Sequence, residues 1–318
     1  MGETSGPVAA IDCGTNSTRL LVVDGDRSVL ERQMRITRLG AGVDATRRLS
    51  AEAIGRTVSV LGEFRRVMGL HGVVRARVVA TSAARDATNA GEFLSAAGDV
   101  TGVRPELLSG REEGALSFAG ATAHLPPDRM AAGQVLVVDI GGGSTELTVG
   151  EISSVTSPAP TVSTVSLDIG CVRVTERFLN HDPPLPGELA DARAAVAAEI
   201  ATAHTVLPPV AARGLLVGLA GTVSTLAALD REILVYDRAV IHHAVLGRGD
   251  VERWLRILSA EDNGARLARP GMVEGRADVI VGGVLVLAAV MADFDRSECL
   301  VSEDDILDGL AASILEDA

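Results

Sequence analysis

Two stretches of the chain, IDCGTNSTRLLV at residues 11–22 and VDIGGGSTELTV at residues 138–149, follow one pattern. Aligned at an offset of 127 residues (139 − 12), they match without gaps at the acid, the first glycine, the Ser-Thr pair and the leucine after it. In each copy an apolar run ends on an aspartate, turns through small polar residues and becomes apolar again, which is typical of a β-hairpin. A carboxylate beside exposed backbone N–H groups can also hold a metal ion and a phosphate group. One copy alone does not decide between these two interpretations.

The two copies differ in charge at one aligned position, because residue 19 is arginine and residue 146 is glutamate. Two related halves that face each other, each with a phosphate-binding turn, would form a cleft large enough for a nucleotide or a polyphosphate. We therefore expect an α/β fold in which two similar domains face a central cleft, with each turn supplying half of one site.

The composition is that of a folded protein. At 318 residues, with 47 % hydrophobic residues and a mean hydropathy of +0.28, the chain has apolar material for about two domains. The longest apolar run, 279–292, is too short and too interrupted by glycine to span a bilayer. No basic region precedes the first apolar stretch, so we expect neither a signal peptide nor a membrane partner. Three distant cysteines suit a reducing cytoplasm better than a disulfide framework.

The charge pattern excludes several classes of protein. The formal net charge is −13, and every basic residue is arginine, because the sequence contains no lysine. A phosphate-binding P-loop and a Schiff-base enzyme both need lysine, so both are excluded. The acidic total argues against nucleic acid as a partner, which needs a basic surface. A local group of arginine forks together with Mg²⁺ could still hold a small polyanion.

Apolar spacing predicts several elements of secondary structure. A helix capped by Ser50 is expected to carry its apolar residues from Ile54 to Met68 and to end near Gly72. We further predict a strand at 73–80, helices at 89–98 and 110–124, and a linker rich in proline and glycine at 124–133.

Seven segments resemble, in the same order, those of the exopolyphosphatase and guanosine pentaphosphate phosphatase family of the actin-like ATPase superfamily. They are IDCGTNSTRL, ATSAARDATN, LLSGREEGALSFAGA, VVDIGGGSTELTVG, SLDIGCVRVTERF, GLAGTVSTLAAL and RADVIVGGVLVLAAVM. The resemblance implies two ribonuclease-H-like domains in the short, two-domain form of the family. We expect residues 1–127 with 304–318 in the first domain and 128–303 in the second. A helix at about 304–317 would return to pack on the first domain.

The resemblance also implies an activity. Family members remove the terminal phosphate from inorganic polyphosphate or guanosine pentaphosphate with Mg²⁺, and water attacks the phosphorus directly. We expect the same chemistry here, together with a connection to the stringent response, and a homodimer is the assembly to test. Two rivals remain open, namely a sensor that binds guanosine tetraphosphate with little turnover and a sugar kinase of the same superfamily.

The second turn is the sharpest motif for metal and phosphate. Its glycines let the backbone approach a ligand closely, so phosphate oxygens are expected at Gly141, Gly142, Gly143 and Ser144. Asp139, and Asp12 in the first turn, are the predicted Mg²⁺ ligands, because Mg²⁺ prefers few carboxylates and several waters. Glu146 on the outgoing strand is predicted to position water or metal. The competing interpretation is a glycine-rich hairpin with incidental acids.

Two adjacent glutamates, Glu112 and Glu113, stand at the start of a predicted helix, where acids are common because of the helix dipole. The resemblance assigns the general base to the second acid, Glu113. Adjacent helical residues point about 100° apart, so both cannot face one phosphate equally, and Glu112 is the reserve candidate.

Other residues are predicted to hold phosphate. Arg19 and Arg85 each offer a guanidinium fork, although Arg85 could instead point to solvent from a helix start. A glycine turn between a strand and a helix places Gly221 and Thr222 at a helix N-terminus, which attracts anions. Asn16, Ser17 and Arg276 complete the predicted phosphate ligands.

Three further features carry weaker signals. Arg173 lies near a turn, and its segment matches the family. The pair His242-His243 has no acid or cysteine at ligand spacing, so we predict polar structural histidines. The segment DDILDGL at 304–310 departs from the family pattern, because acidic residues stand where the family shows a glycine and a basic residue.

Overall fold

The computed structural model describes residues 6–152 and 161–316 and divides the chain into two compact units. Unit 1 is Met1–Gly120 with Ile306–Ala318, and unit 2 is Ala121–Asp305. Within the described ranges, no helix is both long and apolar enough to cross a membrane.

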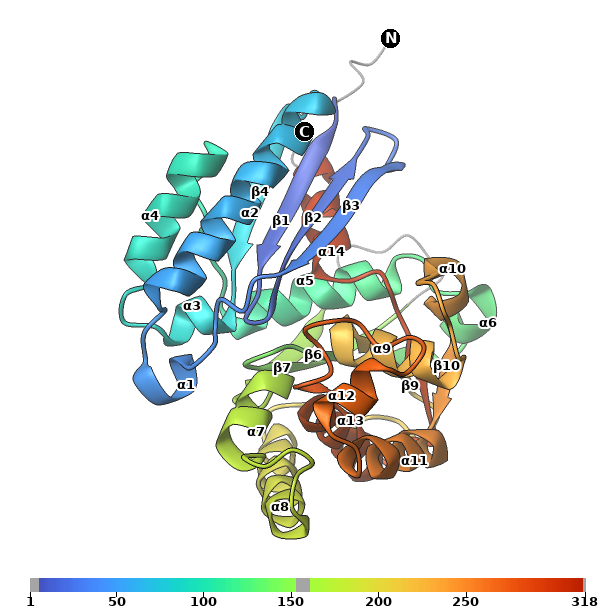
Figure 1. Cartoon of the computed structure of the whole chain (residues 1–318). Coiled ribbons are helices and arrows are strands. Elements are labelled where there is room, and N and C mark those ends of the chain that lie inside the picture. Colours follow the sequence, from blue (N-terminus) through green and yellow to red (C-terminus); the bar gives the residue numbers. More distant parts are fainter. Residues whose placement is uncertain (1–5, 153–160, 317–318) are drawn as a thin grey trace. The chain divides into compact units, whose positions relative to one another are not determined.

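Unit 1 is built on a five-stranded sheet with the order β3-β2-β1-β4-β5 (Figure 1). The first three strands are antiparallel neighbours, whereas β4 pairs parallel with β1 and β5 parallel with β4, so the sheet has the expected ribonuclease-H-like topology. The strands are β1 (Val8–Cys13), β2 (Ser17–Val23), β3 (Val29–Ile36), β4 (Arg75–Ala80) and β5 (Glu106–Leu107). Its helices are α1 (Val43–Thr46), α2 (Ala51–Leu70), α3 (Ser82–Asp86), α4 (Ala90–Thr101), α5 (Gly110–Thr122) and α14 (Ile306–Glu316).

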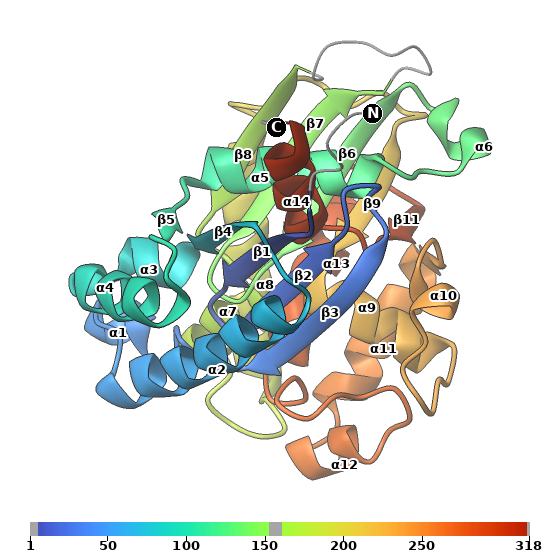
Figure 2. The ribbon, with the colours of Figure 1, turned by 90° about the horizontal axis from the view of Figure 1, so that it is seen from above.

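The two faces of this sheet carry different helices, as Figures 1 and 2 show. Alternate residues of a strand point to opposite faces, so Ala9 and Ile11 pack with the apolar residues of α2 and α4. Val8 and Ala10 point the other way and pack with α14. The cap at Ser50, whose Oγ accepts a hydrogen bond from the Ala53 amide at 3.1 Å, is confirmed, as are the predicted elements β4, α4 and α5.

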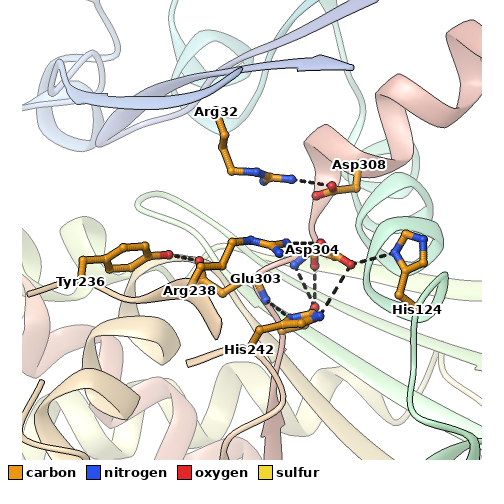
Figure 3. Close-up of polar contacts among 9 residues, drawn as sticks. Arg32, His124, Tyr236, Arg238, His242, Glu303, Asp304 and Asp308 are labelled. Carbon is orange, nitrogen blue, oxygen red and sulfur yellow. Dashed lines mark hydrogen bonds and ion pairs between the residues drawn. The ribbon is translucent and has the colours of Figure 1, made fainter. Parts of the chain in front are cut away.

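The predicted return of the C-terminal helix to the first domain is also confirmed, because α14 completes the core on its face of the sheet. At Gly309 a Cβ atom would lie 2.2 Å from the carbonyl oxygen of Leu116, so only glycine lets α14 approach α5 this closely. An ion pair of 2.5 Å from Arg32 Nη2 to Asp308 Oδ1 ties the same helix to β3 (Figure 3).

Unit 2 repeats the strand order, with one additional edge strand, as β10-β11-β9-β6-β7-β8. Its strands are β6 (Gln134–Ile140), β7 (Thr145–Glu151), β8 (Val162–Leu167), β9 (Leu215–Leu219), β10 (Val245–Gly247) and β11 (Glu298–Val301). Its helices are α6 (Pro127–Met130), α7 (Cys171–Phe178), α8 (Pro186–Ala203), α9 (Ala220–Asp230), α10 (Arg238–Ile241), α11 (Arg248–Ser259), α12 (Asn263–Leu267) and α13 (Ile280–Asp293). The linker predicted at 124–133 contains the short helix α6.

The apolar run 279–292 forms α13, which is buried along most of its length in the core of unit 2. A Cβ at Gly283 would lie 2.2 Å from Thr222 Oγ1, so this glycine lets α9 rest directly on α13. The run is therefore a core helix, as its length and glycines predicted.

Candidate functional site

The two repeated turns have the same backbone geometry in their separate units. In each, the first glycine amide donates to the carbonyl of the serine three residues on, Gly14 to Ser17 and Gly141 to Ser144, both at 3.0 Å. The strand register pairs Asp12 with Arg19 in unit 1 and Asp139 with Glu146 in unit 2. The sequence repeat is therefore a structural repeat of two hairpins.

In the first hairpin, the predicted metal ligand and the predicted phosphate fork contact each other. Arg19 donates to Asp12 Oδ2 from Nη2 at 2.6 Å and from Nε at 3.2 Å, and Asp12 is only 4 % exposed. The carbonyl of Asn16 accepts from the amides of Thr37 and Arg38, at 3.1 and 2.9 Å. Ser17 begins β2, so both residues predicted to bind phosphate lie at the turn itself.

In the second hairpin, two carboxylates occupy the positions that an ion pair occupies in the first. Asp139 is 7 % exposed and Glu146 is 1 % exposed, and directly opposed residues of antiparallel strands share one face of the sheet. Ser166 Oγ, from β8, donates to Glu146 Oε1 at 2.6 Å. The sequence reasoning did not single out Ser166, although strand alternation places it opposite Glu146 in the next strand.

These carboxylates fit the coordination that Mg²⁺ prefers. In the part of the chain that the structure describes, no group of three or more His, Cys, Asp or Glu side chains is placed to hold a metal ion. Mg²⁺ is usually held by one or two carboxylates, with waters and substrate phosphates as its other ligands. A buried pair of like charges also gains from a neighbouring cation. Asp139 and Glu146 therefore suit Mg²⁺, whereas a site made only of protein ligands is not indicated.

The start of α7 is hydrogen-bonded to the backbone of the glycine turn. The Cys171 amide donates to the Gly141 carbonyl, and the amides of Val172 and Arg173 donate to the Gly142 carbonyl, at 2.9 to 3.1 Å. A Cβ at Gly170 would lie 2.5 Å from the Gly142 oxygen, so the approach requires glycine. Arg173, whose sequence signal was weak, is only 5 % exposed and belongs to this support.

The two adjacent glutamates of α5 have different environments. Glu112 is exposed and accepts from the Ser109 amide at 2.8 Å and from Ser109 Oγ at 2.7 Å, and these hydrogen bonds lower the pKa of its carboxyl group. Glu113 is 8 % exposed and accepts from Arg85 Nη1 at 2.5 Å. Arg85 therefore does not simply point to solvent, because it also donates to the Leu108 carbonyl at 3.0 Å. Glu112 therefore caps the N-terminus of α5, and Glu113 is a buried carboxylate that is paired with Arg85.

The start of α9 brings two predicted phosphate ligands together. Arg276 Nη1 donates to the Gly221 carbonyl at 3.2 Å and to Thr225 Oγ1 at 2.8 Å. A Cβ at Gly221 would lie 2.9 Å from Arg276 Cζ, so the glycine makes room for the guanidinium. The preceding Ala220 has a φ of +66°, a left-handed conformation that is costly for a residue with a Cβ and that turns the chain sharply from β9 into α9. The side chain of Thr222 packs against Gly283 of α13.

Side chains of unit 2 neutralise Asp304, which lies in the acidic segment that departs from the family pattern. Figure 3 shows Asp304 among His124, Arg238 and His242. His124 Nδ1 lies 3.0 Å from Asp304 Oδ2, and Arg238 Nη2 donates to Asp304 Oδ1. Burial raises the pKa of Asp304, but the contacts with His124 and Arg238 outweigh it and lower the pKa below its ordinary value. The Asp304 carboxylate therefore stays ionised.

The histidine pair has a structural role, as predicted. Burial lowers the pKa of His242 to about 4, so its ring is neutral near pH 7, and its Nδ1 accepts from the Glu303 amide at 3.0 Å. The His242 and His243 rings stack at 3.7 Å. The hydroxyl of Tyr236 donates to Glu303 Oε2.

Comparison with known proteins gives one consistent family. The family model described as the Ppx/GppA phosphatase family matches residues 21–318. Exopolyphosphatase 2 from Mycobacterium tuberculosis is 42 % identical over 323 residues, which cover 96 % of this chain and 98 % of that protein.

Two solved structures are similar to this chain over nearly its whole length. A protein described as exopolyphosphatase-like has a TM-score of 0.92 at 36 % identity, covering 98 % of this chain and 99 % of that one. The Ppx/GppA family member from Aquifex aeolicus has a TM-score of 0.79 at 32 % identity, covering 98 % of each chain.

Proposed function

Since the chain belongs to the Ppx/GppA phosphatase family, we propose that it hydrolyses the terminal phosphoric anhydride bond of inorganic polyphosphate, of guanosine pentaphosphate, or of both, with Mg²⁺. The name of the Mycobacterium tuberculosis relative supports polyphosphate. Guanosine pentaphosphate enters only through the resemblance of the seven sequence segments to the exopolyphosphatase and guanosine pentaphosphate phosphatase family.

The observation that carries this proposal is the buried Glu113 carboxylate beside Arg85. A general base needs a carboxylate that is held in place and sheltered from bulk water. The Arg85 contact at 2.5 Å holds Glu113, whereas Glu112 is occupied by its cap at Ser109. The difference between the two acids supports the assignment of the base to Glu113.

In this mechanism the oxygen of a water molecule attacks the terminal phosphorus while its proton passes to the Glu113 carboxylate. The bond from that phosphorus to the bridging oxygen breaks, and the shortened chain leaves with the electron pair. Arg19, Arg85 and Arg276 would bind phosphate oxygens, and Gly142, Gly143 and Ser144 would present backbone N–H groups to them, because the Gly141 amide already donates to the Ser144 carbonyl. Asp139, with Glu146 opposite it in the same hairpin, would hold Mg²⁺, which would supply positive charge to the phosphate. Asp12, in unit 1, is the other predicted Mg²⁺ ligand.

The pair of variants Glu113→Gln and Glu112→Gln tests this assignment. Each keeps the size of the side chain and removes the charge. We expect Glu113→Gln to lose about 10²–10⁴-fold in turnover, the usual contribution of a general base, with substrate affinity kept or improved. Glu112→Gln should retain turnover and lose only a few tenths of a kcal/mol of stability.

The measurement is phosphate release from long polyphosphate, short polyphosphate, guanosine pentaphosphate and ATP, with Mg²⁺ or with chelator. Full turnover in Glu113→Gln would move the base to another acid. A wild type that binds these compounds but releases no phosphate from any of them would instead indicate a nucleotide sensor. Transfer of the phosphate to a sugar would indicate the kinase.

A further inference from the structure

A buried guanidinium lies beside the segment that carries Arg276. Arg266, in α12, is only 3 % exposed. Its Nε donates to the Leu258 carbonyl at 2.8 Å, its Nη1 donates to the Ala277 carbonyl at 3.2 Å, and its Nη2 lies 3.0 Å from Asp182 Oδ1. One planar fork therefore joins the end of α11, the segment after α12 and the more distant Asp182.

The Ala277 carbonyl is the informative acceptor. Ala277 lies between Arg276 and Asp278, in a segment at 268–279 that forms turns rather than a helix or strand. The segment has local turn bonds, from the Arg276 amide to Val273 and from the Val279 amide to Arg276, both at 3.1 Å. Isolated turns hold the backbone less firmly than the continuous hydrogen bonds of a helix. The hydrogen bond from Arg266 to the Ala277 carbonyl therefore adds a fixed point to the backbone next to Arg276.

Arg276 has little freedom at its other end. Its guanidinium lies over Gly221, where a Cβ would be 2.9 Å from Cζ, and it donates to Thr225 Oγ1 at 2.8 Å. A small movement of the backbone at 276–277 would therefore move the fork away from the start of α9.

We propose that Arg266 is a positioning residue for the hydrolase, because its guanidinium holds the Ala277 carbonyl and thereby sets Arg276 for binding substrate phosphate at the start of α9. This inference rests on the proposed function, in which Arg276 is a phosphate ligand. It predicts an effect on substrate binding, since Arg266 touches neither the base nor the reacting phosphorus in that mechanism.

Arg266→Lys tests the proposal, because lysine keeps the charge but cannot hold two carbonyls with one rigid fork. We expect KM for short polyphosphate to rise about tenfold with kcat within a factor of about two, the pattern of lost binding rather than lost chemistry. Arg276→Lys should raise KM as well. The double variant should be no worse than Arg276→Lys alone, because both changes act through one contact.

Arg296 supplies a matched control. It is also a buried arginine of unit 2, and its Nη1 donates to the carbonyls of Ala212 and Gly214, at 3.1 and 2.9 Å, in a different part of the unit. Arg296→Lys should lower the melting temperature as Arg266→Lys does, and it should leave KM unchanged. If Arg266 has only a structural role, Arg266→Lys should lower the melting temperature without a change in KM, and this result would overturn the proposal. A double variant with a higher KM than Arg276→Lys alone would also overturn it.

A second variant and a second measurement keep the result decisive. If Arg266→Lys does not yield folded protein, Asp182→Asn, at a half-exposed carboxylate, is expected to raise KM about threefold, and an unchanged KM overturns the proposal. Calorimetric binding of tripolyphosphate, which does not depend on turnover, separates the positioning role of Arg266 from the proposed hydrolase activity. A wild type without turnover ends the proposed hydrolase, whereas equal tripolyphosphate affinity in wild type and Arg266→Lys ends the positioning role.

Discussion

The hairpin β1–β2 of unit 1 and the hairpin β6–β7 of unit 2 have the same backbone geometry but differ in charge. The first carries an ion pair between Asp12 and Arg19, and the second carries the two acids Asp139 and Glu146. Both close with a glycine amide on a serine carbonyl at 3.0 Å, and both place an aspartate one residue before the end of the first strand. The threonines at the start of the two outgoing strands differ in their partners, because Thr18 bonds to Thr37 at 2.9 Å, whereas its counterpart Thr145 donates to the Ile169 carbonyl at 2.6 Å. The residue opposite the aspartate is Arg19 in one hairpin and Glu146 in the other.

This difference in the residue opposite the aspartate bears on the stability of the two hairpins. An opposite-charge pair across two strands stabilises a sheet, whereas like charges directly opposite destabilise it. The first hairpin satisfies the rule and the second breaks it with two nearly buried carboxylates. The departure from the rule marks the second hairpin as the place where a cation would be most favourable.

The largest expected effect comes from Asp139→Asn. Turnover should fall about 10²–10³-fold, because a charge that serves the transition state is removed from a site with little water. The free energy of unfolding should fall by less than in Asp12→Asn, since the residue opposite Asp139 is Glu146 rather than an arginine. Phosphate release over a series of Mg²⁺ concentrations and thermal unfolding with chelator measure the two effects. A variant that loses as much stability as Asp12→Asn under chelator would contradict the account of the second hairpin.

Asp12→Asn should have the larger effect on stability. Arg19, which is largely buried, would lose the carboxylate that it contacts at 2.6 Å, and we expect a loss of about 2 kcal/mol in the free energy of unfolding. Urea denaturation of Asp12→Asn beside Asp139→Asn, both without Mg²⁺, is the direct measurement. Equal stabilities of the two variants would show that the facing residue does not govern the cost.

The smallest effect tests the backbone that the hairpins share. A Cβ at Gly14 would lie 3.1 Å from the Ser17 oxygen, and one at Gly141 would lie 3.0 Å from the Ser144 oxygen. We expect Gly14→Ala and Gly141→Ala to cost about 1 kcal/mol each, since one methyl group must be accommodated against a backbone oxygen. Denaturant melts of the two variants should therefore agree within error. A difference of several kcal/mol would show that the two turns are not equivalent.

Local patterns predicted the parts of the fold that local forces determine. The repeated turn, the Ser50 cap, the helix spacing of α2 and the apolar run of α13 each follow from residues close together in sequence. The family resemblance added the return of α14, which apolar spacing alone does not place.

Contacts between distant side chains could not be predicted in this way. Glu113 and Glu112 look alike in sequence, but Glu113 is buried and contacts Arg85, 28 residues away, whereas Glu112 is exposed and bonds to Ser109. Asp304 appeared as an unexplained acid because its partner His124 stands 180 residues earlier. Arg266 gave no signal, because a carbonyl that accepts a hydrogen bond leaves no mark on residue type.

The packing of α14 has a consequence for the order in which the protein is made. The strands of unit 1 are synthesised first, but Val8, Ala10 and Leu21 are covered on one face by α14, which follows the whole of unit 2 in the chain. Domains generally fold as units while the chain emerges from the ribosome. Unit 1 therefore keeps an apolar sheet face open until α14 has been synthesised and can pack on it. This uncovered sheet face, rather than either hairpin, is where we expect a chaperone to bind during biosynthesis.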